Sequence, residues 1–341
     1  MAERFISVEG APEERGRILA ALTGRSVDRL VACKQKALAE GGSAWRDRIS
    51  RLCRAVERHA PVCHQELCGV IETGRDWSET VSLAFEYELW MEQTRRGDKC
   101  TGFIAANAGR PDIGPILGQT NDEEPSAWLG GACDYVVRHV DERGGRVLIY
   151  SHPGIPAYMG MNSSGLVVLW QYIDNGERDF EEGVPTTALI REMLTKSTLA
   201  EALGYLEGTP RAVPNNFQLG RPGEGAVNVE CTPSRFLVRR VEEGVCCHAN
   251  HITADEELRR EDIGITRTSS TSRLRLGALE ERLPPERGFV SVREAEEALS
   301  GAPVFYERTL AAMVFRPLAG TMRIRFAGEG CDGFRSYSID R

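Results

Sequence analysis

The segment GDKCTGFIAANAGRPDIGPILGQTND, residues 97–122, separates two kinds of sequence. Before it, between Glu13 and Gln93, apolar residues recur every three or four positions, which is the spacing of amphipathic helices. After Cys100, short apolar runs alternate with turn residues, which is typical of strands. The segment itself predicts a β-hairpin in which TGFIAANA and PILGQT are the strands and residues 109–114 form the turn.

The part before the segment is predicted to be mostly helical. Residues 5–8 could form a short strand ahead of the first helix. Gly41 and Gly42 are expected to end one helix and Pro61 another, because glycine and proline disfavour helix interiors. A last helix is predicted to begin at Trp77.

The part after the segment is predicted to alternate strands with a few helices. One helix is expected from Thr187 to Leu206, and the charged residues 255–301 also have a helical pattern. The expected strands lie in RVLIYSH, PAYMGMN, SGLVVLWQYI, GAVNVEC, RFLVRRV and GVCCHAN, with a closing pair in APVFYERTLAAMVFRP and GTMRIRFA.

Composition narrows the class of protein. A chain of 341 residues that is 41% hydrophobic and 27% charged is globular, with length for one large domain or two smaller ones. A net charge of -8 argues against nucleic acid or an acidic membrane as partner. No apolar run reaches the roughly 18 residues that span a bilayer.

The N-terminal sequence and the cysteines suggest a compartment. MAERFISVEGAPEERG contains no apolar core of a secretory signal. Ten cysteines in a chain of this length, without an export signal, are expected to be reduced thiols. The expected location is therefore the cytoplasm.

Cys100 is the candidate nucleophile. A cysteine taken alone is usually a small buried hydrophobe. This one begins a predicted strand directly after the charged run RRGDK, with Thr101 next and the polar run GQTND following at residues 118–122. That context suggests cleavage between Lys99 and Cys100, after which the free residue carries thiol and α-amine together, so that nucleophile and base are one residue.

Several short motifs carry a resemblance to a known family. CTGFIAANA, GQTND, GMNSSGL, EGVP, Arg191, VPNNF, GAVNVE and HANHI occur in this order, after ELCGVIETG and FEYEL. Together they resemble the acyl-coenzyme A:6-aminopenicillanic acid acyltransferase family of Ntn hydrolases, over about residues 60–330. The order of the motifs points to the family and says little about the substrate.

The resemblance implies an α+β fold, the four-layer αββα sandwich of Ntn hydrolases with a helical N-terminal pro-segment. It also implies a precursor that is cut into a helical α chain, residues 1–99, and a catalytic β chain, residues 100–341, which form one integrated domain after cleavage. Family members usually carry glycine before the nucleophile, and this chain has Lys99 there.

The resemblance also assigns roles to two polar residues. Asp122 matches the aspartate of the family's GQNxD pattern and is expected to orient the new α-amine; otherwise it is a turn residue of a loop-like run. Asn250 matches the asparagine of the family's H-x-N-H motif and is expected to donate to the oxyanion; otherwise it hydrogen-bonds within its own loop.

Further residues are weaker candidates for the site. Arg191 is expected to form a structural salt bridge, and either Arg308 or Arg316 could be the active-site arginine. The pocket candidates are Thr101, Tyr172, Asn216, His248 and His251.

We expect neither a metal nor a cofactor. Cys246, Cys247, His248 and His251 have the ligand types of a zinc site. Adjacent cysteines on a strand point to opposite faces, however, and no second cluster of such spacing occurs. GRPGEG, residues 220–225, lacks the phosphate-loop pattern and is predicted to be a hairpin turn.

The sequence thus predicts an enzyme that cleaves or transfers a linear amide or thioester acyl group of a small molecule. If water resolves the acyl-enzyme it is an amidohydrolase, and if an amine does so it is an acyltransferase; an acyl thioester is an alternative donor. The expected partners are the two chains of one precursor, alone or as a homo-oligomer.

Two alternatives belong to other classes. One is an uncleaved, inactive relative acting as a binding or scaffold protein, favoured by Lys99 and the charged residues 255–300. The other is a papain-like thiol protease, which would need a separate catalytic histidine, and no flanking motif supports it.

Overall fold

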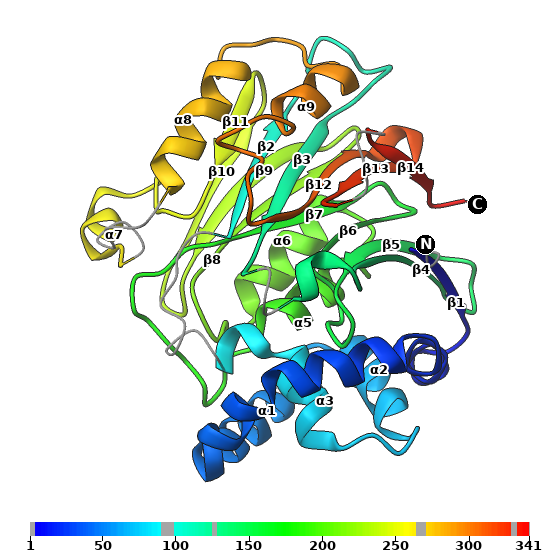
Figure 1. Cartoon of the computed structure of the whole chain (residues 1–341). Coiled ribbons are helices and arrows are strands. Elements are labelled where there is room, and N and C mark those ends of the chain that lie inside the picture. The colour runs from blue at the N-terminus through cyan, green and yellow to red at the C-terminus, as the bar shows by residue number, and fades with distance from the viewer. Residues whose placement is uncertain (1–3, 90–98, 125–127, 264–270, 329–332, 341) are drawn as a thin grey trace.

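Two stacked β-sheets with helices on both outer faces form the chain in the computed structural model (Figure 1). The structure describes residues 4–89, 99–124, 128–263, 271–328 and 333–340, except for the side chains of 34–44. Helices α8 and α9 cover the smaller sheet, and α5, α6 and the N-terminal helices lie against the larger sheet (Figure 1). The predicted αββα sandwich is confirmed.

The strands of the described residues form one sheet of eight and one of six. The larger sheet has the order β1-β4-β5-β6-β7-β8-β9-β10, and the smaller has the order β11-β2-β3-β12-β13-β14. The strands are β1 (Phe5–Glu9), β2 (Cys100–Ala105), β3 (Ile116–Asp122), β4 (Tyr135–Val140), β5 (Arg146–Ser151), β6 (Met159–Asn162), β7 (Val167–Tyr172), β8 (Asn215–Arg221), β9 (Gly225–Cys231), β10 (Phe236–Val241), β11 (Val245–His248), β12 (Thr309–Arg316), β13 (Thr321–Phe326) and β14 (Arg335–Ser338).

The described helices lie in three parts of the chain: before β2, between β7 and β8, and between β11 and β12. They are α1 (Pro12–His59), α2 (Pro61–Ile71), α3 (Trp77–Ala84), α5 (Thr186–Met193), α6 (Leu199–Gly208), α7 (Glu256–Glu261), α8 (Ser272–Arg282) and α9 (Val292–Ala298), with short 3-10 turns at Leu129–Gly131 and Pro317–Ala319. None of the described helices is both long enough and apolar enough to cross a bilayer.

The predicted hairpin lies at the centre of the smaller sheet. β2 pairs with β3 in antiparallel register, with Cys100 opposite Asn121 and Ala105 opposite Ile116. β11 and β12 flank the hairpin, and β7 and β8 of the larger sheet pack against it. Every residue of β2 and β3 is buried, because the larger sheet covers one face of this hairpin and helices cover the other. Strands that are buried on both faces do not alternate apolar with polar residues.

The N-terminal predictions are confirmed except for one helix end. β1 pairs in parallel with β4, Pro61 begins α2, and Trp77 begins α3. Gly41 and Gly42 do not end a helix, because α1 continues through them to His59. Each glycine costs a helix only about 1 kcal/mol, and the packing of α1 against α2 and α3 outweighs that cost.

The helix predicted from Thr187 to Leu206 is two helices. α5 ends at Met193 and α6 begins at Leu199 after a cap at Thr198. The Thr198 hydroxyl accepts from the backbone N–H of Glu201 at 3.1 Å, and the Glu201 carboxylate accepts from the N–H of Thr198 at 3.1 Å. This capping box is written in the sequence as T-L-A-E, and it starts a new helix where apolar spacing alone suggested continuation.

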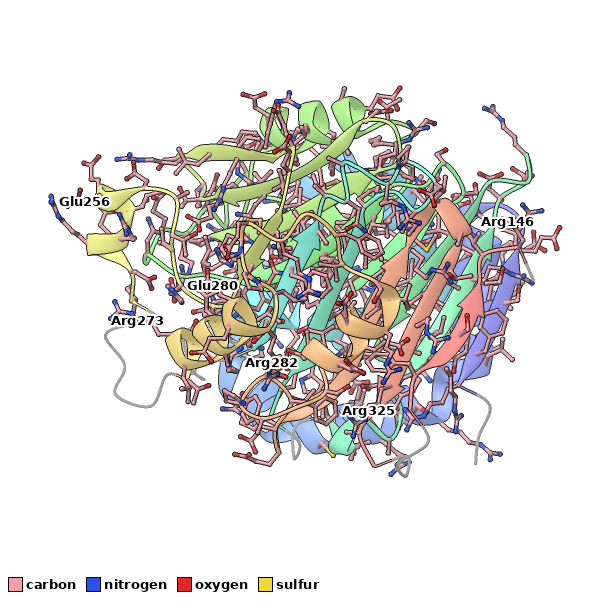
Figure 2. The ribbon with its side chains drawn as sticks, turned by 90° about the horizontal axis from the view of Figure 1, so that it is seen from above. Arg146, Glu256, Arg273, Glu280, Arg282 and Arg325 are labelled. Carbon is pink, nitrogen blue, oxygen red and sulfur yellow. The ribbon has the colours of Figure 1, made fainter. Side chains whose placement is uncertain are left out.

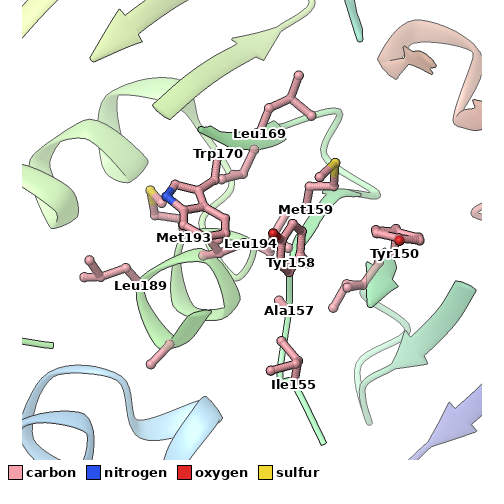
Figure 3. Close-up of a cluster of buried hydrophobic side chains, with 14 of the residues drawn as sticks. Tyr150, Ile155, Ala157, Tyr158, Met159, Leu169, Trp170, Leu189, Met193 and Leu194 are labelled. Carbon is pink, nitrogen blue, oxygen red and sulfur yellow. The ribbon is translucent and has the colours of Figure 1, made fainter. Parts of the chain in front are cut away.

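The larger hydrophobic core joins the eight-stranded sheet to the helices below it. Figure 3 shows Leu189, Met193 and Leu194 of the α5 region beside Trp170 of β7 and Tyr158. All five side chains are buried, and burial of each large apolar group stabilises the fold by about 1.5–3 kcal/mol. A second core cluster lies between the six-stranded sheet and helices α8 and α9.

Candidate active site

The peptide bond between Lys99 and Cys100 is held on three sides. The Lys99 carbonyl accepts a hydrogen bond from the backbone N–H of Asp122 at 2.5 Å. The backbone N–H groups of Lys99 and Cys100 donate to Oδ1 of Asn250 at 2.8 and 2.9 Å. Cys100 is the first residue of β2 and is completely buried. The structure therefore brings together Cys100, Asp122 and Asn250, which come from three separate parts of the chain.

Asn250 follows β11 and is fixed through both ends of its side chain. Its Oδ1 also accepts from Nη2 of Arg275 at 2.8 Å, and its Nδ2 donates to the carbonyl of Tyr172 at 3.0 Å. Because all three groups at Oδ1 are donors and the group at Nδ2 is an acceptor, the amide has one orientation. The second N–H of Nδ2 has no acceptor among the described residues.

Arg275 of α8 is the arginine of this site, and sequence reasoning missed it. Its Nη1 donates to the Cys100 carbonyl at 2.7 Å and to the hydroxyl of Thr101, and it lies 3.4 Å from Oδ2 of Asp122. The side chain is completely buried, whereas Arg273 on the same helix is exposed and lies at the edge of the molecule (Figure 2). A buried guanidinium in this position holds the hairpin and Asn250 together.

The two arginines suggested by the sequence lie elsewhere. Arg308 pairs with Glu124 at 3.9 Å, and Arg316 is the half-buried last residue of β12. A signal for Arg275 was present, because it precedes Leu279 and Leu283 by one and two helical turns. Both leucines are buried, so Arg275 lies on the inward stripe of α8.

Asp122 is the last residue of β3 and is completely buried, so it is a strand residue and not a loop turn. Oδ1 accepts from the Thr309 hydroxyl at 2.6 Å, and Oδ2 accepts from the Thr120 hydroxyl at 3.2 Å. Burial raises the pKa of Asp122 to about 6, although Arg275 and the Thr309 bond oppose the shift. The carboxyl is therefore ionised above that pH.

The thiol of Cys100 is protonated in the intact chain at neutral pH. Burial raises its pKa, and the carboxylates of Asp122 and Glu123 raise it further, which outweighs Lys99 and Arg275. A nucleophilic attack by this sulfur therefore needs a group that removes the proton.

Neither His248 nor His251 is placed to remove the thiol proton of Cys100. Both ring nitrogens of His248 face acceptors, the Ala249 carbonyl at 2.8 Å and the Glu230 carboxylate at 2.7 Å. Nδ1 of His251 lies 2.7 Å from the Ser272 hydroxyl, which accepts from the N–H of Asn250 at 2.7 Å. Burial lowers the pKa of His251 to about 4. These contacts make His251 a support for Asn250.

The other pocket candidates have different positions. Thr101 is buried beside Cys100, and its N–H donates to the Thr120 hydroxyl at 3.1 Å. The carbonyl of Tyr172 contacts Asn250, and its own hydroxyl donates to Asp174 at 2.6 Å. Asn216 donates to the side chain of Gln171 at 2.5 Å, within the polar layer between the two sheets.

Three structural interpretations are confirmed. Arg191 forms a buried ion pair with Glu66 at 2.6 Å. The turn at residues 220–225 joins β8 to β9 as a hairpin. Cys246 packs in the larger core and Cys247 against the second cluster, so the adjacent cysteines do point to opposite faces. Within the described residues, no group of three or more His, Cys, Asp or Glu side chains is arranged to hold a metal ion.

One solved structure shares the fold, and two others are reported as similar to this chain. The Caenorhabditis elegans ortholog of N-acylethanolamine-hydrolyzing acid amidase is 18% identical and superposes with a TM-score of 0.50, covering 70% of this chain and all of that one. A mutant of conjugated bile acid hydrolase from Clostridium perfringens is 12% identical, with a TM-score of 0.48 over 71% and 92% of the two chains. Penicillin V acylase from Agrobacterium tumefaciens is 16% identical, with a TM-score of 0.44 over 67% and 83%.

The family assignment comes from the sequence profile of the acyl-coenzyme A:6-aminopenicillanic acid acyl-transferase family, which matches residues 116–330. The match includes Asp122 and Asn250 and begins after Cys100. No curated protein sequence matches the chain. Because the profile covers more than half of the chain, the chain belongs to the acyl-coenzyme A:6-aminopenicillanic acid acyl-transferase family, and it is an amidohydrolase or acyltransferase of the Ntn type.

Proposed function

We propose that the chain cleaves its own Lys99–Cys100 bond and then works as an enzyme with Cys100 as N-terminal nucleophile. The observation that carries this proposal is the clamp on that peptide bond. Its carbonyl accepts from the N–H of Asp122 at 2.5 Å, and its N–H donates to Asn250 at 2.9 Å. A donor at 2.5 Å from the carbonyl oxygen stabilises the negative charge that develops there under attack.

The cleavage proceeds as an acyl shift. Cys100 Sγ bonds to the carbonyl carbon of Lys99, the bond from that carbon to the Cys100 nitrogen breaks, and the thiol proton ends on the nitrogen. Water then hydrolyses the thioester and leaves a carboxylate on Lys99 and a free thiol on Cys100. The products are the proposed α chain, residues 1–99, and the proposed β chain, residues 100–341.

The same sulfur then serves turnover. The freed α-amine of Cys100, with an ordinary pKa of about 7.7–8.0, takes the thiol proton and later gives it to the leaving amine. Oδ1 of Asn250, already 2.9 Å from this nitrogen, keeps the amine in place, while the second N–H of its Nδ2 donates to the oxyanion. Asp122 holds Arg275 beside the site.

The acyl group on Cys100 is resolved by water or by an amine. The first outcome is hydrolysis of a linear amide, and the second is acyl transfer, with either an amide or an acyl thioester as donor. Both proposed outcomes use the same acyl-cysteine intermediate, and the contacts at Cys100 and Asn250 support either one.

Intact mass of the purified chain tests the proposal. We expect fragments 1–99 and 100–341 from the wild-type chain, and an uncut chain from Cys100→Ala. Equal cleavage of both chains would indicate an external protease. An uncut wild-type chain would favour the other candidate function, an inactive relative that acts as a binding or scaffold protein, for which Lys99 in place of the family's glycine is the supporting observation.

A further inference from the structure

The side chain of Lys99 occupies a built binding site for a cation. Its ammonium lies 3.0 and 2.9 Å from the two carboxylate oxygens of Glu123, and 5.6 Å from the centre of the Tyr87 ring. Glu123 also accepts from the hydroxyl of Tyr158 at 2.7 Å. The side chains of Lys99 and Glu123 are only 21% and 6% exposed. Lysines are rarely this enclosed unless they are paired.

Aromatic rings complete this site. Trp170 contacts Tyr87 edge to face at 4.9 Å and Tyr158 at 5.1 Å. Figure 3 shows Tyr158 and Trp170 next to each other in the buried core. We call Glu123, Tyr158, Tyr87 and Trp170 the lysine seat. A carboxylate beside an aromatic face, here Glu123 and the ring of Tyr87, recognises an ammonium group, because the negative charge and the ring quadrupole both attract a cation.

Hydrolysis of the thioester releases Lys99 from the sulfur of Cys100, and every residue of the lysine seat except Tyr87 belongs to the catalytic chain. Glu123, Tyr158 and Trp170 all follow Cys100 in the sequence, so cleavage does not separate them from the nucleophile. Burial raises the pKa of Glu123, but the Lys99 ammonium and the hydrogen bonds from Lys99 and Tyr158 outweigh burial, so the pKa is lowered and the carboxyl is ionised beside Lys99. A buried carboxylate that has lost its cation is unfavourable, and a cationic ligand restores the pairing.

The thioester of maturation and the acyl-enzyme of turnover are the same kind of adduct on the same atom. In the first, the acyl group is the carbonyl of Lys99 with its side chain in the lysine seat. In the second, it is the acyl group of the substrate. A side chain that starts from the acyl carbon therefore has the same route to the seat in both adducts.

We infer that the lysine seat selects the acyl part of the substrate, and that this part carries an ammonium group at the distance of a lysine side chain. Five carbons separate the carbonyl of Lys99 from its ammonium nitrogen, as in a 6-aminohexanoyl or lysyl group. Glu123 is then the residue that determines acyl specificity. This inference rests on the proposed function, since it uses Cys100 as the acylated residue.

The test compares three probes with six-carbon acyl groups on the wild-type protein as purified. These are the p-nitroanilides of 6-aminohexanoic acid, hexanoic acid and adipic acid, whose chain ends are cationic, neutral and anionic. We expect kcat/KM to be about 100-fold higher for the cationic probe than for the neutral one, and lowest for the anionic one. The same acids offered as N-acetylcysteamine thioesters should give the same order of acylation of Cys100, read from intact mass.

Two variants assign the preference to the seat. Glu123→Gln keeps the size of the side chain and removes its charge, so the ratio between cationic and neutral probes should fall to near one. Glu124→Gln removes the neighbouring carboxylate, which pairs with Arg308 outside the seat, and should keep the wild-type ratio.

The outcomes separate this inference from the proposed function. Cleaved wild-type protein that acylates with the hexanoyl probe as fast as with the aminohexanoyl probe, or with none of the three, overturns the inference while maturation stands. Retention of the preference by Glu123→Gln overturns it as well. The ratio of kcat/KM between the cationic and neutral probes on the wild-type protein tests the inference even if a variant does not fold. A wild-type chain that stays uncut overturns the proposed function itself.

Discussion

The bond at Cys100, the proposed nucleophile, is held by hydrogen bonds that a single asparagine makes through both ends of its side chain. Asn250 accepts three donors through Oδ1 and donates through Nδ2. Oδ1 accepts from the two N–H groups beside the Lys99–Cys100 bond that is proposed to be cleaved. Nδ2 is proposed to donate a hydrogen bond to the oxyanion. Two substitutions at this residue can therefore separate maturation from turnover.

Asn250→Asp should still mature but turn over slowly. Its carboxylate can accept from the N–H groups of Lys99 and Cys100 and from Arg275, but it has no N–H for the oxyanion. We expect kcat on the proposed substrate to fall by about 10²–10³-fold, the loss typical of one oxyanion donor. Gel analysis of cleavage and steady-state kinetics measure the two effects. Asn250→Ala, which loses both sides, should also slow cleavage; near-wild-type turnover by the aspartate variant would remove Asn250 from the oxyanion role.

The pH dependence distinguishes an amine base from an imidazole base. In the proposed mechanism activity requires the unprotonated α-amine of Cys100, so kcat/KM should rise with pH toward about 8 and level off above the amine's pKa. His251, whose pKa burial lowers to about 4, would give a limb near pH 4 instead. Both nitrogens of His248 already face acceptors.

His248→Gln and His251→Asn should therefore keep the upper limb of the pH–rate profile, even where affinity drops. The measured pKa will belong to the coupled amine and thiol of Cys100. Disappearance of the limb in either variant, with complete cleavage at Cys100, would replace the N-terminal mechanism by a Cys–His pair.

At the scale of elements, helix α8 carries one arginine into the candidate site and a second one on its exposed face. Arg275 faces the hairpin and Arg273 faces outward, because residues two apart on a helix point in different directions. Only the buried one connects α8 to Cys100, Thr101, Asp122 and Asn250.

Arg275→Met should destabilise the uncut chain strongly and slow maturation. It leaves the buried carboxylate of Asp122 without its guanidinium, and loss of one partner of a buried ion pair typically costs about 3–5 kcal/mol. Urea unfolding of the Cys100→Ala chain with and without the substitution measures the cost. Arg273→Met on the exposed face is the matched control and should change the free energy of unfolding by less than about 0.5 kcal/mol; equal effects of the two would contradict the role of Arg275.

At the scale of the whole molecule, the N-terminal segment is part of the sandwich. β1 pairs with β4 at the edge of the larger sheet, and Glu66 of α2 bonds to Arg191 of α5 and to Arg15 of α1. Burial raises the pKa of Glu66, but Arg191 and His139 outweigh it, so the pKa is lowered. The carboxylate therefore stabilises the fold above the ordinary pKa of a glutamate, about 4.3, and loses this effect as the pH falls below that range.

The two proposed chains should remain together after cleavage and should separate more easily when Glu66 is changed. We expect fragments 1–99 and 100–341 to elute as one species in gel filtration, and Glu66→Gln to lower the urea concentration at which they separate. In the uncut Cys100→Ala chain the same change should cost about 3–5 kcal/mol.

Glu72→Gln provides the control for Glu66. Glu72 pairs with Arg17 at the surface, where the two side chains are 54% and 47% exposed, and such pairs contribute about 0–1 kcal/mol. Dissociation of wild-type fragments without denaturant would show that the N-terminal segment does not remain in the sandwich.

The sequence alone determined the hairpin at Cys100, most of the strands and the family, because these depend on local alternation, turn residues and the order of short motifs. It placed Asp122 and Asn250 among the candidates by motif, and the structure lets both contact the Lys99–Cys100 bond. It mistook a helix end at Gly41 and Gly42 and missed the capping box at Thr198, since apolar spacing does not reveal which helices pack together. Only the tertiary structure decided that Arg275 is the arginine of the site and that Glu123 holds Lys99, because these contacts join residues far apart in the chain through charge pairing in a buried layer.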